Sequence, residues 1–351
     1  MDSSKLSIPI ANLYYLLAYA WDQYAPGDEN DQATEGFDNI HDLLASVLCR
    51  GVRRLAVRGL DKNYAEHTEQ SPRLRGKILL ADSYRRLTHR SGTMICEFDE
   101  LATNTLPNRI LRTTVDRLLT GQVIGKKVRP DVRHAQRMLE GIIPTALSSR
   151  MFNQVQLHRN NKHYRLLLHI CRLLHESFLP GESEGHSRFR DILTDETRMP
   201  QLFEKFVLNF ARVHLKKTKA YAERIHWNEA TADDIVLGVL PTMLTDVTLE
   251  APDRKTILDC KFYKEALVAR KDKYRFHSSH LYQLNAYLQN KAKQSGWEQV
   301  DGILLYPAVD HNCDYRFQLL GHDAQVRSVD LDKPWQQIET ELLGILGGAA
   351  T

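Results

Sequence analysis

The sequence lacks the patterns that anchor a chain in a membrane or tie it together covalently. None of its apolar runs reaches the roughly 18 consecutive residues that a membrane-spanning helix needs. Its first residues, MDSSKLSIPIANLYY, do not show the basic and then apolar stretch of a signal peptide, so we expect a cytoplasmic protein without membrane contact. The five cysteines are widely spaced and form no C-x-x-C pair, which argues against a disulfide framework or a zinc site.

A phosphate-binding loop is also missing. The nearest candidate, Gly121 to Lys127, has one residue too few between its glycines and no Ser or Thr after the lysine. The sequence shows no helix-turn-helix or zinc-finger pattern for reading DNA sequence. Nucleotide chemistry and specific DNA recognition would therefore belong to a partner. A formal net charge of +3 permits a polyanionic partner without indicating one.

What is present is an ordinary globular composition, with 42% hydrophobic and 26% charged residues in a chain of 351. That length suggests about two domains. We place the junction in the polar, proline-bracketed segment 180–200, which separates an α+β N-terminal region, 1–180, from a C-terminal domain, 195–351. The N-terminal region is predicted to have buried or amphipathic helices at 11–24 and 38–54, a strand-rich part over 55–100 that starts with LAVRGL, and a helical part over 105–178.

The C-terminal domain alternates helix and strand patterns. The order is helix, two strands, helix, two strands and a closing helix, with the segments MPQLFEKFVLNFARVHLKK, VLPTMLTDVTLE, KTILDCKFYK, HSSHLYQLNAYLQNKAK, VDGILLYP, YRFQLLG and WQQIETELLGIL. Such an order predicts an α/β domain in which a mixed central sheet is flanked by helices.

Charged residues interrupt the first predicted strand pair. Asp259 and Lys261 lie two residues apart and so share one face of their strand, about 6.6 Å from each other along it. Asp246, on the preceding strand, reaches the same point if the two strands form a hairpin. A surface salt bridge is the alternative for Asp-x-Lys, but the apolar flanks Ile257-Leu258 and Phe262-Tyr263 favour a covered strand, where charge is costly.

Two carboxylates and the backbone carbonyl of Cys260 form a hard-oxygen ligand set that suits Mg²⁺. Such an ion activates water and neutralises charge on a phosphoryl oxygen, and a neighbouring lysine can orient or deprotonate the water. Gln283 and Tyr287 lie four residues apart and hence on one helix face, from which they can point to the site. Glu204 interrupts an apolar helix face and is either a third carboxylate or a solvated residue.

In this order, a helix with Glu, a strand with Asp, a strand with Asp-x-Lys and a helix with Gln-x-x-x-Tyr resemble the PD-(D/E)xK nuclease superfamily, in the variant of RecB-like nucleases. The stretches ANLYYLLAYAW, LPNRILR, TDVTL, ILDCKFYK and FHSSHLYQLNAYL are similar to McrC, the endonuclease subunit family of 5-methylcytosine-specific McrBC restriction systems. The likeness extends over essentially the whole chain.

The resemblance implies a Mg²⁺-dependent endonuclease that cuts double-stranded DNA in a modification-dependent antiviral restriction complex. It implies a partner, a McrB-like hexameric ring of AAA+ GTPase subunits, which uses the GTP, is docked by the N-terminal region and is stimulated by this chain. Asp246, Asp259 and Lys261 carry over as catalytic residues. Glu204, Gln283 and Tyr287 carry over as supporting residues of the superfamily.

Two other functions stay open from the sequence. The chain could be a non-catalytic activator or scaffold of a ring NTPase, in which case loss of an acid or the lysine would be expected; all three are present. It could also be a free-standing structure-specific nuclease, which would not need the long N-terminal region.

Overall fold

The computed structural model describes residues 8–22, 37, 39–121, 123–158, 161–177, 198–227, 239–262, 267–270, 273–308 and 312–347. The chain divides into two compact units. We call residues 1–38 and 181–351 the sheet unit, and residues 39–180 the arm unit. None of the described helices is long and apolar enough to cross a membrane.

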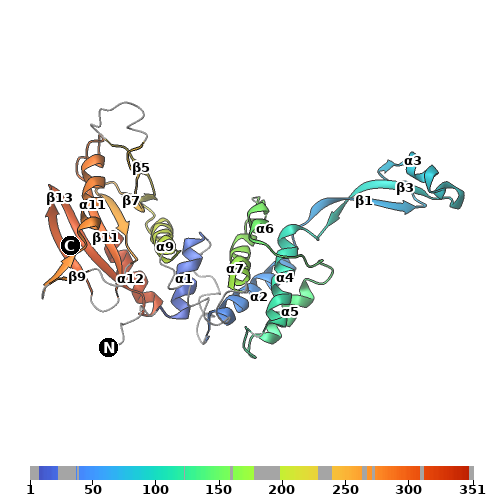
Figure 1. Cartoon of the computed structure of the whole chain (residues 1–351), viewed down its shortest axis with the longest axis horizontal. Helices are drawn as coiled ribbons and strands as arrows, with labels where there is room; N and C mark the ends of the chain where they lie inside the picture. The colour runs from blue at the N-terminus through green and yellow to red at the C-terminus, as the bar shows by residue number, and fades with distance from the viewer. Residues whose placement is uncertain are drawn as a thin grey trace. The chain divides into compact units, whose positions relative to one another are not determined.

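The arm unit combines a helical body with a projecting β-ribbon (Figure 1). Its helices are α2 (Ile40–Arg58), α3 (Leu80–Arg85), α4 (Leu106–Thr120), α5 (Arg129–Met138), α6 (Ser149–Gln154) and α7 (Tyr164–Ser177), with a 3₁₀ turn, η2 (Thr88–Ser91). Its strands are β1 (Asn63–Ser71), β2 (Lys77–Ile78) and β3 (Met94–Ala102). β1 and β3 pair antiparallel from Asn63↔Ala102 to Ser71↔Met94, and β2 and α3 lie at the far end of this ribbon, which we call the arm.

The arm is fixed to the helical body at its root by a buried amide. The side chain of Asn108, in α4, is fully buried; its Nδ2 donates to the carbonyls of Asp61 and Thr103, at 2.9 and 2.7 Å. Its Oδ1 accepts from the hydroxyl of Tyr164 at 2.7 Å, and that hydroxyl accepts from the N–H of Asp61 at 2.8 Å. Both ends of the ribbon are thus held by one network of neutral hydrogen bonds.

Most predictions for the arm unit are confirmed, and one is wrong. The predicted helix 38–54 is α2, which continues to Arg58, so LAVRGL is the last helical turn and not a strand. The helix stops at Gly59, whose φ of +99° suits a residue without a side chain. The part predicted to be strand-rich, 55–100, contains β1, β2 and most of β3 but also α3 and η2, and the part from 105 to 178 is helical where it is described.

The sheet unit contains a mixed six-stranded sheet of order β12-β13-β11-β8-β7-β4. Its strands are β4 (Lys219–Tyr221), β7 (Val247–Glu250), β8 (Lys255–Cys260), β11 (Asp301–Ala308), β12 (Asp314–Leu319) and β13 (His322–Asp330). Two further strand pairs join β5 (Arg224–Ile225) to β6 (Met243–Leu244) and β9 (Leu267–Arg270) to β10 (Lys273–Phe276). The strands β8, β11 and β13 run parallel, and β12, β7 and β4 run antiparallel to their neighbours.

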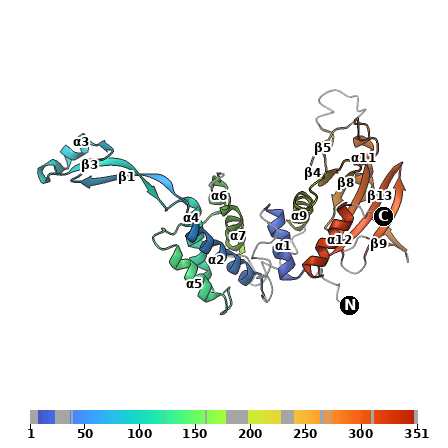
Figure 2. The same ribbon diagram turned by 180° about the vertical axis from the view of Figure 1, so that it is seen from behind.

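Helices cover both faces of this sheet, as the sequence predicts. On one face, α11 (Ser278–Lys291) packs Leu284 and Leu288 into a core with Ile257 and Val326. On the other lie α9 (Arg198–His214), whose Phe203 contacts Phe262, and α12 (Trp335–Gly347) (Figure 2). The predicted order of elements did not include β4 or β13. The predicted junction at 180–200 lies almost wholly outside the described residues.

The first helix, α1 (Ile10–Ala20), belongs to the sheet unit, whereas the predicted division places it in the N-terminal region. The ring of Tyr15 stacks on Trp335 of α12 at 4.2 Å. Asn209 of α9 donates to the carbonyl of Tyr19 at 2.9 Å, and Asn12 donates to that of Leu331 at 2.8 Å. These contacts join segments about 190 or more residues apart, which no local sequence pattern reveals.

Candidate active site

The β7–β8 hairpin brings Asp246 and Asp259 together. Its last ladder pair is Val247 with Leu258, so Asp246 and Asp259 occupy the next positions, opposite each other. The chain bends at Asp246, and its Oδ2 accepts a hydrogen bond from the N–H of Cys260 at 2.7 Å. A carboxylate thus replaces the main-chain carbonyl that would continue the ladder.

Lys261 lies on the same face as Asp259, as the alternation of side chains predicts. Its Nζ is 2.8 Å from Oδ2 of Asp259, and its backbone N–H donates to the carbonyl of Leu305 at 2.8 Å, which keeps this end of β8 against β11. Asp259 is 1% exposed and the Lys261 side chain 16%. A surface salt bridge is therefore excluded as the explanation of this Asp-x-Lys.

Helix α11 supplies the next contacts. Oε1 of Gln283 accepts from Nζ of Lys261 at 2.9 Å, and its Nε2 donates to the hydroxyl of Tyr287 at 2.7 Å. That hydroxyl donates to the carbonyl of Leu244 at 3.0 Å. The four-residue spacing predicted that Gln283 and Tyr287 share a face. That this series of hydrogen bonds ends on the main-chain carbonyl of Leu244 could not be predicted from the sequence.

The charges of the site act strongly on one another. Burial, then Asp259 and then Glu204 raise the pKa of Asp246 to about 7. Burial raises the pKa of Asp259 as well, although Lys261 opposes this. Burial lowers the pKa of Lys261, but Asp259 and then Asp246 outweigh it and the net shift is upward. The two carboxylates thus repel each other, and the lysine stays a cation.

Glu204 is half-buried on α9, and burial raises its pKa while the charge of Lys261 lowers it. Its charge therefore acts on the site, since it also raises the pKa of Asp246; the sequence had left open a third carboxylate or a solvated residue. Among the described residues no three Asp, Glu, His or Cys side chains lie close enough to hold a metal ion together. Within the described part of the chain, a third carboxylate ligand is thus not in place.

Nearly the whole chain is similar to known proteins. The family model of the McrBC 5-methylcytosine restriction system component matches residues 4–307. The chain belongs to this McrBC family. It is 33% identical over 339 residues to the type IV methyl-directed restriction enzyme EcoKMcrBC of Escherichia coli K12, with 96% of this chain and 97% of that protein covered. The membership expected from the sequence is confirmed.

A solved structure shares the fold. It is a half-complex from a tetradecameric assembly of Thermococcus gammatolerans McrB AAA+ hexamers with bound McrC. The match has a TM-score of 0.60 at 17% identity and covers 96% of this chain and 76% of that one. At this identity the match shows that the two chains share a fold.

The donor set of the site suits a hard divalent cation. Oδ2 of Asp259 is fully buried and, among the described residues, accepts no hydrogen bond of good geometry besides its ion pair with Lys261. The N–H of Cys260 points toward Asp246, and in a strand the C=O of a residue points to the same side as its N–H. Two carboxylates and the Cys260 carbonyl would therefore face one point, where a cation would stabilise the charged form of both carboxylates against the burial that raises their pKa values.

Proposed function

We propose that this chain is the Mg²⁺-dependent DNA endonuclease subunit of a modification-dependent restriction complex. The observation that carries the proposal is the buried cluster of Asp246, Asp259 and Lys261 in a member of a 5-methylcytosine restriction family. Taking two carboxylates and an ammonium out of water costs several kcal/mol per ion. A cluster that stays buried at this cost is expected to have a function. The order of α9 with Glu204, Asp246, β8 and α11 supports a PD-(D/E)xK nuclease fold.

Asp246, Asp259 and the Cys260 carbonyl would hold Mg²⁺, with Glu204 as a further contributor to the negative field. The ion, when bound, supplies Lewis-acid stabilisation of the phosphoryl oxygens and lowers the pKa of water. Lys261, held by Asp259 and Gln283, points its ammonium at the same place, where it orients the attacking water and the scissile phosphate. Tyr287 keeps the Gln283 amide in the orientation that accepts from Lys261.

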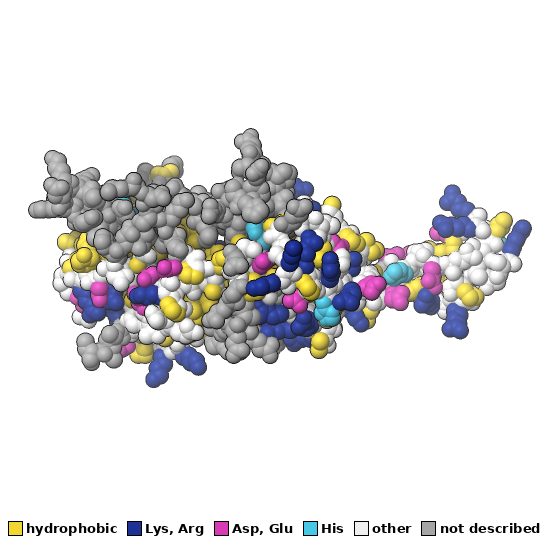
Figure 3. Space-filling model, turned by 90° about the horizontal axis from the view of Figure 1, so that it is seen from below, with side chains coloured by type: hydrophobic (Ala, Val, Ile, Leu, Met, Phe, Trp, Pro, Cys, Tyr) yellow, Lys and Arg dark blue, Asp and Glu magenta, His cyan; other side chains and the backbone are white. Residues whose placement is uncertain are grey.

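The arm supports a second part of the proposal, that the N-terminal region docks on a ring of AAA+ GTPase subunits. Basic side chains gather at the far end of the arm (Figure 3). Arg75 and Lys77 are engaged with Glu69 and Glu97 of the ribbon, at 2.5 and 3.0 Å. Apolar side chains are exposed beside them, and these are Leu74, Leu80, Tyr84 and Leu87, at 63, 56, 61 and 49%. Exposed apolar groups beside basic ones are typical of a protein-binding surface.

Cleavage of methylated plasmid DNA tests the proposal. The purified chain would be incubated with Mg²⁺, alone and with a McrB-like AAA+ subunit, in GTP or ATP. We expect cleavage only with partner and nucleotide, and none with Asp259→Asn, which still stimulates nucleotide hydrolysis. Cleavage by the chain alone would indicate a free-standing nuclease. Stimulated hydrolysis without cleavage by the natural sequence would indicate a scaffold.

A further inference from the structure

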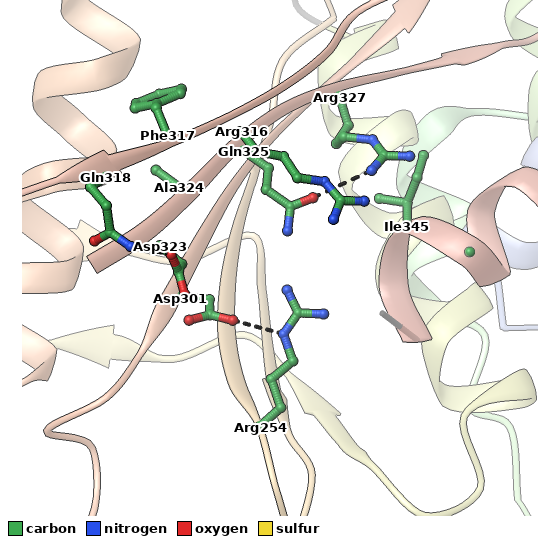
Figure 4. Close-up of a pocket in the computed structure, with 11 residues that line it drawn as sticks. Arg254, Asp301, Arg316, Phe317, Gln318, Asp323, Ala324, Gln325, Arg327 and Ile345 are labelled. Carbon is green, nitrogen blue, oxygen red and sulfur yellow. Dashed lines mark hydrogen bonds and ion pairs between the residues drawn. The ribbon is translucent and has the colours of Figure 1, made fainter. Parts of the chain in front are cut away.

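The sheet unit contains a cavity of about 440 Å³ on the sheet face that α12 covers. Arg254, just before β8, Arg316 of β12 and Arg327 of β13 line it, with Gly344 and Ile345 of α12 as one wall. Their guanidinium groups come from separate segments and point into one space, where those of Arg254 and Arg316 face each other (Figure 4). Three like charges that converge in this way repel one another.

Carboxylates near these arginines engage only some of their N–H groups. Nε of Arg254 donates to Asp301 at 2.8 Å, and Nη1 of Arg327 lies 3.1 Å from Asp314. Arg316 reaches Asp314 only at 3.9 Å, and both of these side chains are 60% exposed. Asp323, the other acid on the wall, accepts from Gln318.

Donor groups are left over in the cavity. A guanidinium has five N–H groups in a planar fork, and the hydrogen bonds and ion pairs of each arginine with the described residues use one or two of them. Nε of Arg327 is buried and has no hydrogen-bond partner among the described residues. An unpaired buried donor costs about 1–3 kcal/mol. An anion with several oxygens, placed between the three forks, would pair with the N–H groups that line the cavity.

We propose that this arginine-lined cavity is a binding site for a phosphate group. Arginine forks match the oxygens of phosphate in pairs, which a spherical halide cannot do. The exposed Arg316 lies at the mouth, so a phosphate can enter while it remains part of a larger molecule. Its source is either the backbone of DNA, if the proposed function is right, or free phosphate.

The cavity is separate from the candidate active site. Arg254 precedes β8 and Asp259 lies near its end, about 16 Å further along the strand. Asp259 and Lys261 face α11, whereas Gln325 and Arg327 lie on the face opposite Val326, which packs against α11. Phosphate binding here can therefore be measured without cleavage, and its failure would leave the nuclease proposal untouched.

The test uses the full chain without Mg²⁺ and two probes, a fluorescein-labelled 20-base-pair duplex followed by anisotropy and inorganic phosphate followed by calorimetry. Arg316→Gln combined with Arg327→Gln removes two forks. Gly344→Gln leaves the charge unchanged and adds a side chain to the wall of the cavity, where a Cβ would meet nothing within 4 Å. The matched control is Lys219→Gln, an 80% exposed cation 4.0 Å from Glu250 on the far edge of the sheet.

A DNA backbone source predicts that both cavity variants weaken duplex binding at least about 10-fold. The slope of log affinity against log salt should fall by about 0.9 for each phosphate that the variant no longer neutralises, and Lys219→Gln should change affinity less than twofold. A free-phosphate source predicts that both variants abolish the calorimetric signal of inorganic phosphate and leave duplex affinity unchanged. If the natural sequence binds neither probe, or if the cavity variants bind both as the control does, the proposal is wrong.

Discussion

Nζ of Lys261, just after β8, donates to Oε1 of Gln283, on α11, at 2.9 Å. This contact determines which group donates in the next hydrogen bonds, from Gln283 to Tyr287 and from Tyr287 to Leu244. An ammonium only donates, so Gln283 must present its oxygen to Lys261 and its N–H₂ group to Tyr287. Tyr287 then donates to Leu244. The main chain at β6 thus sets the orientation of the amide that holds the lysine.

Gln283→Ala should lower the rate of cleavage about 10- to 100-fold, because displacing a reacting group by about 1 Å can cost 100-fold. The thermal stabilisation by Mg²⁺ should stay as in the natural sequence, since neither carboxylate is altered. Tyr287→Phe should give a smaller loss of the same kind. A large change in Mg²⁺ affinity in Gln283→Ala would contradict a purely positioning role.

Replacement of Lys261 by Met keeps the apolar stem and removes the ammonium. Cleavage should fall at least about 100-fold, the usual contribution of a positioned acid or base, while GTP hydrolysis by the partner is still stimulated. Lys261→Arg separates two roles, because a guanidinium stays charged but does not accept a proton. Activity retained in Lys261→Arg would mean that the residue acts by its charge alone.

Asp246 makes the stability of the metal-free protein depend on pH. Its pKa is about 7 in the folded chain against an ordinary 3.8, so between these values the folded state binds more protons than the unfolded state. The free energy of unfolding should therefore fall as pH rises from about 4 to about 7, by up to about 1.4 kcal/mol per pH unit, and level off above.

Asp246→Asn keeps an oxygen for the N–H of Cys260 and removes the charge, so the metal-free variant should melt several degrees higher than the natural sequence at pH 8. Mg²⁺ should raise the melting temperature of the natural sequence and not that of the variant. Differential scanning calorimetry from pH 4 to 8 measures both effects. An unchanged pH slope in Asp246→Asn would show that Asp246 does not titrate in this range.

The root of the arm should tolerate few substitutions. Asn108→Ala removes the donor to the carbonyls of Asp61 and Thr103 and the acceptor of the Tyr164 hydroxyl proton, at about 1–3 kcal/mol for each group left unsatisfied, so the arm unit should lose several kcal/mol of stability and its ribbon should become sensitive to protease. Tyr164→Phe, which removes one hydroxyl, should have a smaller effect. Urea unfolding and limited proteolysis would show whether the order is reversed.

Charge reversal at the far end of the arm tests docking. Arg85→Glu with Arg86→Glu changes two exposed residues of α3 and its C-cap and should reduce stimulation of the partner GTPase at least about 10-fold. Arg53→Glu, an exposed arginine of the helical body 3.8 Å from Asp131, is the control. Equal effects of both would indicate a general electrostatic attraction and no specific role of the arm.

The site was more predictable than the fold around it. Alternation along a strand is enough to place Asp259 and Lys261 on one face, and a tight hairpin leaves Asp246 little choice of partner. Gln283 and Tyr287 follow from the helical repeat. These relations depend only on neighbours in sequence or on one adjacent strand, so they can be predicted without knowledge of the rest of the fold.

The errors have physical causes. LAVRGL contains residues that suit a strand, but it continues a helix whose face is buried, and the tertiary core overrides local preference. β13 alternates buried residues with Gln325 and Arg327, which line a cavity, so its polar half resembles a loop. The position of α1 depends on Trp335 and Asn209, and no window of sequence contains all three.

The uninterrupted ladder of the arm also has a consequence for its length. β1 and β3 are nine residues each, without a bulge in their register, and successive side chains of a strand point to opposite faces. Insertion of one residue in each strand would move the far end outward by about 3.3 Å and turn it to the other face, whereas two residues would add about 6.6 Å and restore its facing. We therefore expect relatives whose arm differs in length to differ by an even number of residues in each strand of the ribbon.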